Sequence, residues 1–160
     1  MFTLQKVVQG ICNFVDENGK PHGYCILTEK QDHSCNIKLE LVDLPPGEHG
    51  FHIHKSADMR KGPASCGEHY NPFNKTHGDL ISKERHLGDL GNIIVDSKGK
   101  CNSQIDVEYL PLKSDNHIQI IGRSMIIHAD MDDKGLGGFP DSKSNGHSGA
   151  RLFYGIIGYL

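Results

Sequence analysis

Residues 49–54, His49-Gly50-Phe51-His52-Ile53-His54, are the stretch of this sequence from which its fold and its chemistry can be inferred. Side chains of an extended strand alternate between two faces, so His52 and His54 point the same way, about 6.6 Å apart along the strand. Two imidazoles at that spacing can converge on one metal ion. The other side chains of the stretch point to the opposite face, towards a core, and His49 is expected there as a buried histidine bonded to backbone. The stretch therefore predicts a metal-binding strand whose remaining ligands come from elsewhere in the chain.

The composition limits the class of protein. The chain has 160 residues, enough for one domain, which we place at residues 1–160. A net charge of −3 and a pI of about 6.4 give no electrostatic reason to expect a nucleic acid or an anionic membrane as partner. No stretch has the length or the apolar character of a membrane span. The eleven histidines are far above ordinary usage and need an explanation.

The N-terminus and the cysteines indicate the cellular compartment. Residues 1–10 contain no sustained apolar run, so we expect no signal peptide and a cytoplasmic protein. The chain has five cysteines, Cys12, Cys25, Cys35, Cys66 and Cys101, an odd number that leaves at least one thiol free within a monomer. In a reducing compartment most of them would be free.

Short extended runs separated by turn signals follow one another on both sides of the histidine strand. Residues 35–41 alternate between apolar and polar side chains, the period of a half-buried strand. The expected strands are residues 4–15, 22–29, 35–41, 49–54, 90–96, 103–110, 118–127 and 152–159. Two long irregular stretches, 55–89 and 129–149, interrupt them. The pattern predicts an all-β fold, an eight-stranded antiparallel Greek-key sandwich or barrel with two long functional loops.

Further candidate ligands lie in the first of these loops or at a strand end. They are His69, His77, His86, Asp89 and His128. Imidazole suits copper and zinc, and three histidines with one aspartate form a sensible tetrahedral zinc site. With the two strand histidines the ligands number seven, one short of two four-coordinate sites, so one loop histidine could serve both metals. By contrast His22, His33 and His117, in or beside turns, are expected at the surface.

Several longer motifs together resemble those of the copper/zinc superoxide dismutase family. They are residues 47–54, His69-Tyr70-Asn71-Pro72, His77-Gly78, residues 85–92, residues 121–128 and Gly149-Ala150-Arg151-Leu152. The resemblance covers nearly the whole chain. It implies dismutation of superoxide to dioxygen and hydrogen peroxide, an antioxidant activity, with one copper and one zinc per chain.

The resemblance also implies a role for each candidate residue. Copper would be bound by His52, His54, His69 and His128, and zinc by His69, His77, His86 and Asp89. His69 would bridge the two metals and exchange a proton during turnover. Asp132 would accept hydrogen bonds from one ligand of each metal, and Arg151, with help from Lys143, would attract the superoxide anion. A homodimer and a copper chaperone are the protein partners implied.

The sequence departs from the family in two features, the disulfide and the channel. The family's disulfide joins the first long loop to the last strand, but Tyr154 and Pro63 occupy the two cysteine positions here. Cys66 would then be free or paired elsewhere, with Cys12 as a conceivable partner, and the chain could mature without the copper chaperone. Asn145 stands where the family commonly has a threonine that narrows the channel, which affects substrate selectivity and rate.

Other readings of the sequence lead to other classes of protein. One is a non-catalytic relative, similar to a copper chaperone or a metal store, although the chain has no room for the chaperones' extra copper-binding domain. Another is a sandwich with structural zinc only. A calcium-binding loop at residues 130–141 is rejected, because Lys134 falls where an oxygen ligand is needed and Asp141 replaces the closing glutamate.

Overall fold

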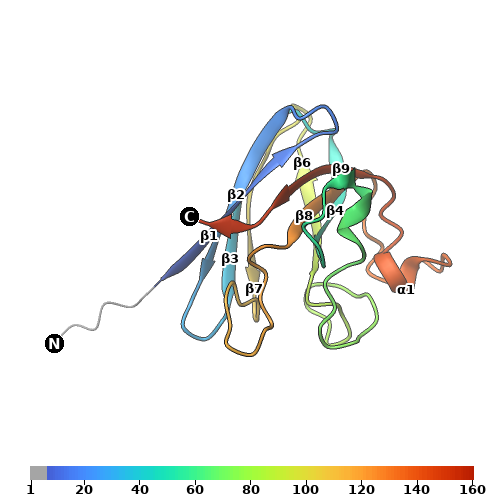
Figure 1. The fold of residues 1–160 in the computed structure, drawn as a ribbon. Helices are drawn as coiled ribbons and strands as arrows, with labels where there is room; N and C mark the ends of the chain where they lie inside the picture. Colours follow the sequence, from blue (N-terminus) through green and yellow to red (C-terminus); the bar gives the residue numbers. More distant parts are fainter. Residues whose placement is uncertain (1–6) are drawn as a thin grey trace.

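The computed structural model describes residues 7–160, and these residues consist almost entirely of antiparallel strands and loops (Figure 1). The strands are β1 (Val8–Val15), β2 (Pro21–Glu29), β3 (Cys35–Leu41), β4 (Gly47–His54), β5 (Arg60–Pro63), β6 (Asp89–Val95), β7 (Cys101–Val107), β8 (Ser124–His128), β9 (Arg151–Ile156) and β10 (Gly158–Tyr159). The helices within this range are η1 (Ala64–Cys66) and α1 (Ser142–Asn145). No helix in the described range is long and apolar enough to cross a membrane.

One sheet runs around the molecule in the order β6-β4-β8-β9-β1-β2-β3-β7, and β10 adds to β1. Strands β6 and β7 stand at the two ends of this order, yet they are consecutive in the chain and lie next to each other, so the sheet nearly closes. Strand β4 pairs with β6 and β8 rather than with β3, which is the crossing expected of Greek-key strands. The predicted all-β Greek-key barrel is confirmed.

Alternation of side chains explains how the strands form one core. In β3 the apolar side chains are buried and face inwards, while Lys38 and Glu40 face solvent. In β4, Phe51 and Ile53 are fully buried, and the Phe51 ring meets that of Phe14 edge to face at 6.1 Å. The inner face of β4 thus anchors the strand, and its other face carries His52 and His54.

Some expected boundaries are wrong, and others lie partly outside the described residues. Residues 4–6 of the first expected strand are not described. The strand expected at 118–127 begins only at Ser124, because the N–H groups of Ile120 and Ile121 donate to carbonyls of Pro111 and Leu112. The last strand is interrupted at Ile157, whose N–H donates to Arg123 O.

The two long loops lie against the same part of the barrel. In Figure 1 the loop after β4 and the loop carrying α1 both lie on the right, beside β4 and β8. The first loop contains a short strand that was not expected, β5. His22 was expected at the surface but is buried, with its ring nitrogens 3.1 Å from Val42 O and 3.1 Å from an Asp16 carboxylate oxygen.

Candidate metal centre

Three of the candidate ligands come from two neighbouring strands. His52 and His54 lie on β4, where they pair with Ile126 and Ser124 of β8, and His128 is the last residue of β8. All three side chains are buried, because the loops cover this outer face of the sheet. The sequence prediction that His52 and His54 share one face is therefore correct.

The backbone of the first loop is laid along β4 and carries His69 to the strand histidines. An isolated bridge pairs His69 with His54, and Tyr70 N donates to Ile53 O at 2.8 Å. Ile53 N in turn donates to Gly88 O at 2.9 Å, which fixes the end of the loop. A Cβ at Gly88 would overlap the Ile53 carbonyl oxygen, so only glycine allows this close approach.

A first cluster of four imidazoles results from these contacts. One ring nitrogen from each of His52, His54, His69 and His128 lies within 4.8 Å of those of the other three. The outer nitrogens of two rings are fixed by carbonyl oxygens: His54 Nδ1 lies 2.8 Å from Gly67 O, and His128 Nδ1 lies 3.2 Å from Gly149 O. The inner Nε2 atoms of these two rings are then 3.4 Å apart. The cluster has the geometry of a small, all-nitrogen metal site.

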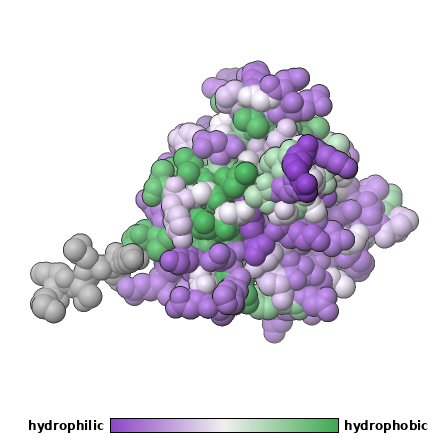
Figure 2. Space-filling view, in the orientation of Figure 1, coloured by the Kyte–Doolittle hydropathy of each residue, from purple (hydrophilic) through white to green (hydrophobic). Residues whose placement is uncertain are grey.

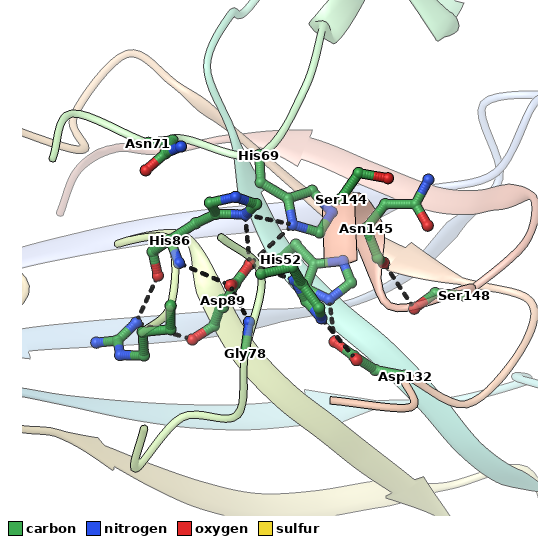
Figure 3. Close-up of polar contacts among 12 residues, drawn as sticks. His52, His69, Asn71, Gly78, His86, Asp89, Asp132, Ser144, Asn145 and Ser148 are labelled. Carbon is green, nitrogen blue, oxygen red and sulfur yellow. Dashed lines mark hydrogen bonds and ion pairs between the residues drawn. The ribbon is translucent and has the colours of Figure 1, made fainter. Parts of the chain in front are cut away.

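A second cluster adjoins the first and shares His52 and His69 with it. Ligand atoms of His52, His69, His77 and Asp89 lie within 4.8 Å of one another. His86 lies at the same place, with Nδ1 3.3 Å from His69 Nδ1 and 3.2 Å from Asp89 Oδ1. Figure 3 shows His69, His86 and Asp89 converging there. The structure thus brings together all seven residues that the sequence proposed as ligands.

Asp89 is held from several sides by the loop that it closes. Its Oδ2 accepts from His86 N at 2.8 Å and from Gly78 N at 3.1 Å, while Oδ1 faces the imidazoles. The Arg85 guanidinium donates to the carbonyls of His86, Leu87 and Asp89 and so holds the same turn from outside. No role for Arg85 was predicted from the sequence, in which its position beside His86 is the only signal.

Asp132 connects the two clusters from behind. Its two oxygens accept from His52 Nε2 at 2.6 Å and from His77 Nε2 at 2.8 Å. Asn92 of β6 fixes the backbone of Asp132 with two bonds, donating to its carbonyl at 2.9 Å and accepting from its N–H at 2.7 Å. The carboxylate therefore determines which nitrogen of each ring faces the cluster.

The protonation of these rings follows from burial and from their carboxylate partners. Burial, with repulsion from the neighbouring imidazoles, lowers the pKa values of His52 and His54 well below the ordinary value. Burial likewise lowers the pKa of His128 to about 3. His77 behaves differently: burial is outweighed by its bonds to Asp132 and Asp89, which raise its pKa to about 9. The first cluster is thus neutral and rich in lone pairs, which suits cation binding.

The hydrogen bonding of three buried ring nitrogens indicates whether these residues fit a metal. Within residues 7–160, His52 Nδ1 and His69 Nε2 are buried without a hydrogen-bond partner, and the only polar contact of His77 Nδ1 is with Asp89 Oδ1 at 3.0 Å. Unpaired buried polar atoms are costly and need an explanation. Neutral imidazole nitrogens beside a carboxylate are suitable ligands for copper and zinc. The residues therefore fit both metals.

A pocket of about 410 Å³ opens beside the first cluster. Its lining includes three cations, Lys75, Lys143 and Arg151, one carboxylate, Glu68, and the small polar side chains of Asn71, Thr76, Ser144, Asn145 and Ser148. Arg151 donates to Pro63 O at 2.9 Å, and partial burial lowers the pKa of its guanidinium. Lys75 was missed in the sequence, although it lies between His69 and His77. The pocket is suited to a small anion.

A model of the family described as copper/zinc superoxide dismutase matches residues 21–157. The chain belongs to the copper/zinc superoxide dismutase family. A curated relative from Brugia pahangi, named extracellular superoxide dismutase [Cu-Zn], is 40% identical over 97% of this chain and 78% of its own length. Superoxide dismutase [Cu-Zn] 3 of Arabidopsis thaliana is 47% identical over 78% of this chain and 75% of its own length. A solved structure titled as that of the clock protein EA4 has a TM-score of 0.89 and 34% identity, and the match covers 100% of this chain and 98% of the other.

These matches settle the class of protein. The chain is an enzyme that dismutates superoxide, and its cofactors are copper and zinc. The likeness to named dismutases over most of the chain favours this over the non-catalytic and zinc-only readings of the sequence. The cytoplasmic location expected from the N-terminal sequence is contradicted, because the Brugia relative that aligns with 97% of the chain is named as extracellular.

The first long loop is not held to the barrel by a disulfide at Cys66. All five cysteines are free in the structure, so no bridge joins Cys66 to Cys12. The Cys66 sulfur is buried and lies 3.6 Å from Asp58 O and 3.6 Å from the Met59 sulfur. The bond from Arg151 to Pro63 O, together with the backbone bonds to β4, connects this loop to the barrel without a disulfide.

Proposed function

We propose that this dismutase works at two metals bridged by His69. Copper would be held by His52, His54, His69 and His128, and zinc by His69, His77, His86 and Asp89. His52 and His69 both lie in the two clusters, but His52 Nε2 is bound to Asp132, so His69 alone can offer one ring nitrogen to each metal, and this observation carries the assignment. His69 Nδ1 lies 2.8 Å from Asp89 Oδ1, while its Nε2 is buried without a partner on the side of the strand histidines. Each of its two nitrogens therefore faces a different cluster.

The overall reaction converts two superoxide anions and two protons into dioxygen and hydrogen peroxide. When bound, copper supplies the one-electron chemistry, and zinc, which has no redox chemistry, supplies fixed positive charge. The chain itself provides a proton-holding atom at the site, because His69 Nε2 is buried and unbonded. Asp132 keeps the rings of His52 and His77 in one tautomer throughout.

The pocket residues attract and orient the anion. The enzyme has a net charge of −3, so the positive potential that superoxide needs must be local. Arg151 supplies it beside the first cluster, and Lys143 and Lys75 extend it to the pocket rim. The negative charge of Glu68 weakens the positive potential at one side of the pocket, which favours entry of superoxide past the lysines.

His128 offers the sharpest test of the copper assignment. Its replacement in His128→Ala removes a ligand of the first cluster only, so copper content and dismutation should be lost while zinc content is largely kept. His117→Asn, at an exposed histidine outside both clusters, is the matched control and should keep both metals. Both metals are measured by mass spectrometry on the sample used for the superoxide assay. Equal loss of copper and zinc would contradict the assignment.

We also propose a homodimer of single-domain subunits. Exposed apolar side chains gather at the paired ends of β1 and β10, where Val7, Tyr159 and Leu160 are each more than half exposed. Figure 2 shows hydrophobic surface in this region of the molecule. Sedimentation velocity should give twice the mass of 17.7 kDa, and Tyr159→Glu should shift the enzyme to the monomer. A wild-type monomer at micromolar concentration would contradict the proposal.

Two further proposals concern maturation and location. Without a cysteine at position 154, the chain acquires copper independently of a copper chaperone. Active enzyme from cells lacking the chaperone is the expected result, and copper-free product there would overturn it.

Following its Brugia relative, the enzyme is extracellular, and immunodetection in the medium of the source cells tests this directly.

A further inference from the structure

Two cysteines face each other inside the barrel, away from the metal centre. Cys12 of β1 and Cys25 of β2 are direct partners in the antiparallel ladder. Both side chains are completely buried and belong to the hydrophobic core, so they point to the same side of the sheet. Neither thiol has a part in binding metals or substrate.

The backbone geometry at this pair suits a disulfide. Directly opposed residues in an antiparallel ladder have Cα atoms about 4.5–5.5 Å apart, which lies within the range of about 4.4–6.8 Å that a disulfide needs. A β-bulge lies between Phe14 and Val15, and Gly23 has a φ of +112°. Bulges increase the local twist of a strand pair, so the hairpin is strongly twisted close to the Cys12–Cys25 pair.

The surroundings of the pair are apolar. The Cys25 sulfur lies 3.6 Å from the Met125 sulfur, and a Cβ at Gly155 would lie 2.8 Å from the Cys12 sulfur. Glycine at 155 therefore leaves room for the Cys12 side chain. Burial, and secondarily the neighbouring Cys25 thiol, raise the pKa of Cys12 well above its ordinary value. In the folded enzyme the two thiols are thus shielded from oxidants and unreactive.

The remaining cysteines have no such partner. Cys35 is opposed by Glu29 and Val107, and Cys101 is opposed by Leu41. Cys66 lies outside the sheet, in η1. Within the described residues 7–160, which contain all five cysteines, the fold therefore places only one pair in cross-strand register.

We propose that Cys12 and Cys25 form a disulfide when the chain folds in an oxidising environment, before the barrel encloses them. With a small disulfide such as oxidised glutathione, one cysteine thiolate attacks a glutathione sulfur and releases one glutathione thiolate. The second cysteine then attacks the mixed disulfide and releases the other. Two protein thiols are oxidised and one glutathione disulfide is reduced to two thiols. The free thiols of the structure are the reduced form of the same pair.

The disulfide closes a short loop that includes the turn between β1 and β2. A loop of about 15 residues should favour the folded state by about 100-fold in the unfolding equilibrium. Enclosure should also protect the bond. A reductant at millimolar concentration then reduces it only at the rate at which the barrel opens, and added denaturant speeds the reduction.

The test counts thiols and maps bonds in the whole chain. Enzyme is unfolded and reduced, refolded in a glutathione redox buffer, and its folded fraction is alkylated in denaturant and analysed by peptide mass spectrometry. Enzyme secreted to the bacterial periplasm gives the same readout without refolding. We expect three alkylated cysteines and one crosslinked peptide pair containing Cys12 and Cys25.

Two single variants separate this bond from other pairings. Cys101→Val removes a buried cysteine outside the pair, so it should leave two thiols and the same crosslink. Cys25→Val should leave four thiols and no crosslink. Five alkylated cysteines in the wild-type enzyme from both routes, or a crosslink that includes Cys35, Cys66 or Cys101, would overturn the proposal.

Discussion

The ring of His52 and the carboxylate of Asp132 lie 2.6 Å apart, and both are almost completely enclosed, at 0% and 1% exposure. The second oxygen of the same carboxylate lies 2.8 Å from His77. His52 lies in both clusters and His77 only in the second, so one buried side chain from the second long loop orients a ring in each. This explains why Asp132 matters although it is not among the proposed ligands.

Asp132→Asn should weaken binding of both metals. The asparagine amide keeps the shape of the carboxylate but loses its charge. Only its oxygen can accept a hydrogen bond, so either His52 or His77 loses its partner. Loss of such a supporting partner typically costs about 10–100-fold in metal affinity. Chelator competition measures the affinities. Asp130→Asn, two residues away and exposed, is the matched control and should bind both metals as the wild type does.

Zinc affinity of the metal-free enzyme should rise with pH up to about pH 9. The pKa of His77 is raised to about 9, because Asp132 and Asp89 outweigh the effect of burial. At neutral pH the ring is therefore protonated, and zinc must displace that proton, which costs about tenfold in affinity for each pH unit below this pKa. Above pH 9 the His77 ring is already deprotonated, so zinc affinity no longer changes with pH through this residue. Chelator competition between pH 7 and pH 10 checks this, and an affinity independent of pH would contradict it.

The same pKa has a consequence for folding of the metal-free enzyme. Because the folded pKa of His77 lies above the unfolded value of about 6.5, its contribution is fully present below pH 6.5 and is lost as the pH rises towards 9. The melting temperature of metal-free enzyme should fall across this window. His77→Gln should reduce that fall, and an undiminished slope in the variant would assign it to another group.

Gly146→Ala should destabilise the second long loop and the metal centre together. Gly146 has a φ of +73°, and an added Cβ would overlap Asp132 Oδ1 and crowd the His77 ring. Gly138, in the same loop, has a φ of +75° with nothing within 4 Å of its Cβ position. Gly138→Ala should therefore cost only the left-handed backbone penalty of about 1–2 kcal/mol, with zinc retained. Equal zinc loss in both variants would show that backbone conformation alone matters.

Arg151→Gln should slow the reaction with superoxide without removing the metals. Arg151 is a pocket cation held by Pro63 O, and local positive potential raises the association rate of small anions by about 10-fold or more. We expect a similar drop in kcat/KM and a weaker dependence on ionic strength. Arg60→Gln, at an exposed arginine outside the pocket, should change neither quantity. An unchanged salt dependence in Arg151→Gln would rule out steering by this residue.

The sequence was sufficient for the fold class and for the set of residues that meet at the site. Period-two alternation places His52 and His54 on one face, and turn signals separate the strands correctly in most places. The number of histidines in loops indicated that further ligands would arrive. These features depend on local periodicity and composition, which are visible in a single chain.

Other features depend on contacts between residues far apart in the chain. The break at Ile157 comes from its bond to Arg123, and the burial of His22 comes from Val42 and Asp16. Periodicity indicates which face a side chain takes, but not which group it meets there. For the same reason the choice of ring nitrogen at His52, set by Asp132 some 80 positions later, could not be predicted from sequence.

His69 belongs to both clusters, so their occupancies are thermodynamically linked. Any ion that orders this ring at one nitrogen changes the free energy of binding at the other, and the linkage is reciprocal by necessity. If filling the second cluster changes the metal affinity of the first by some factor, filling the first changes the affinity of the second by the same factor. With the proposed bridge at His69, a single imidazole shared between the loop and the strand would make the loading of each metal depend on the other within one subunit.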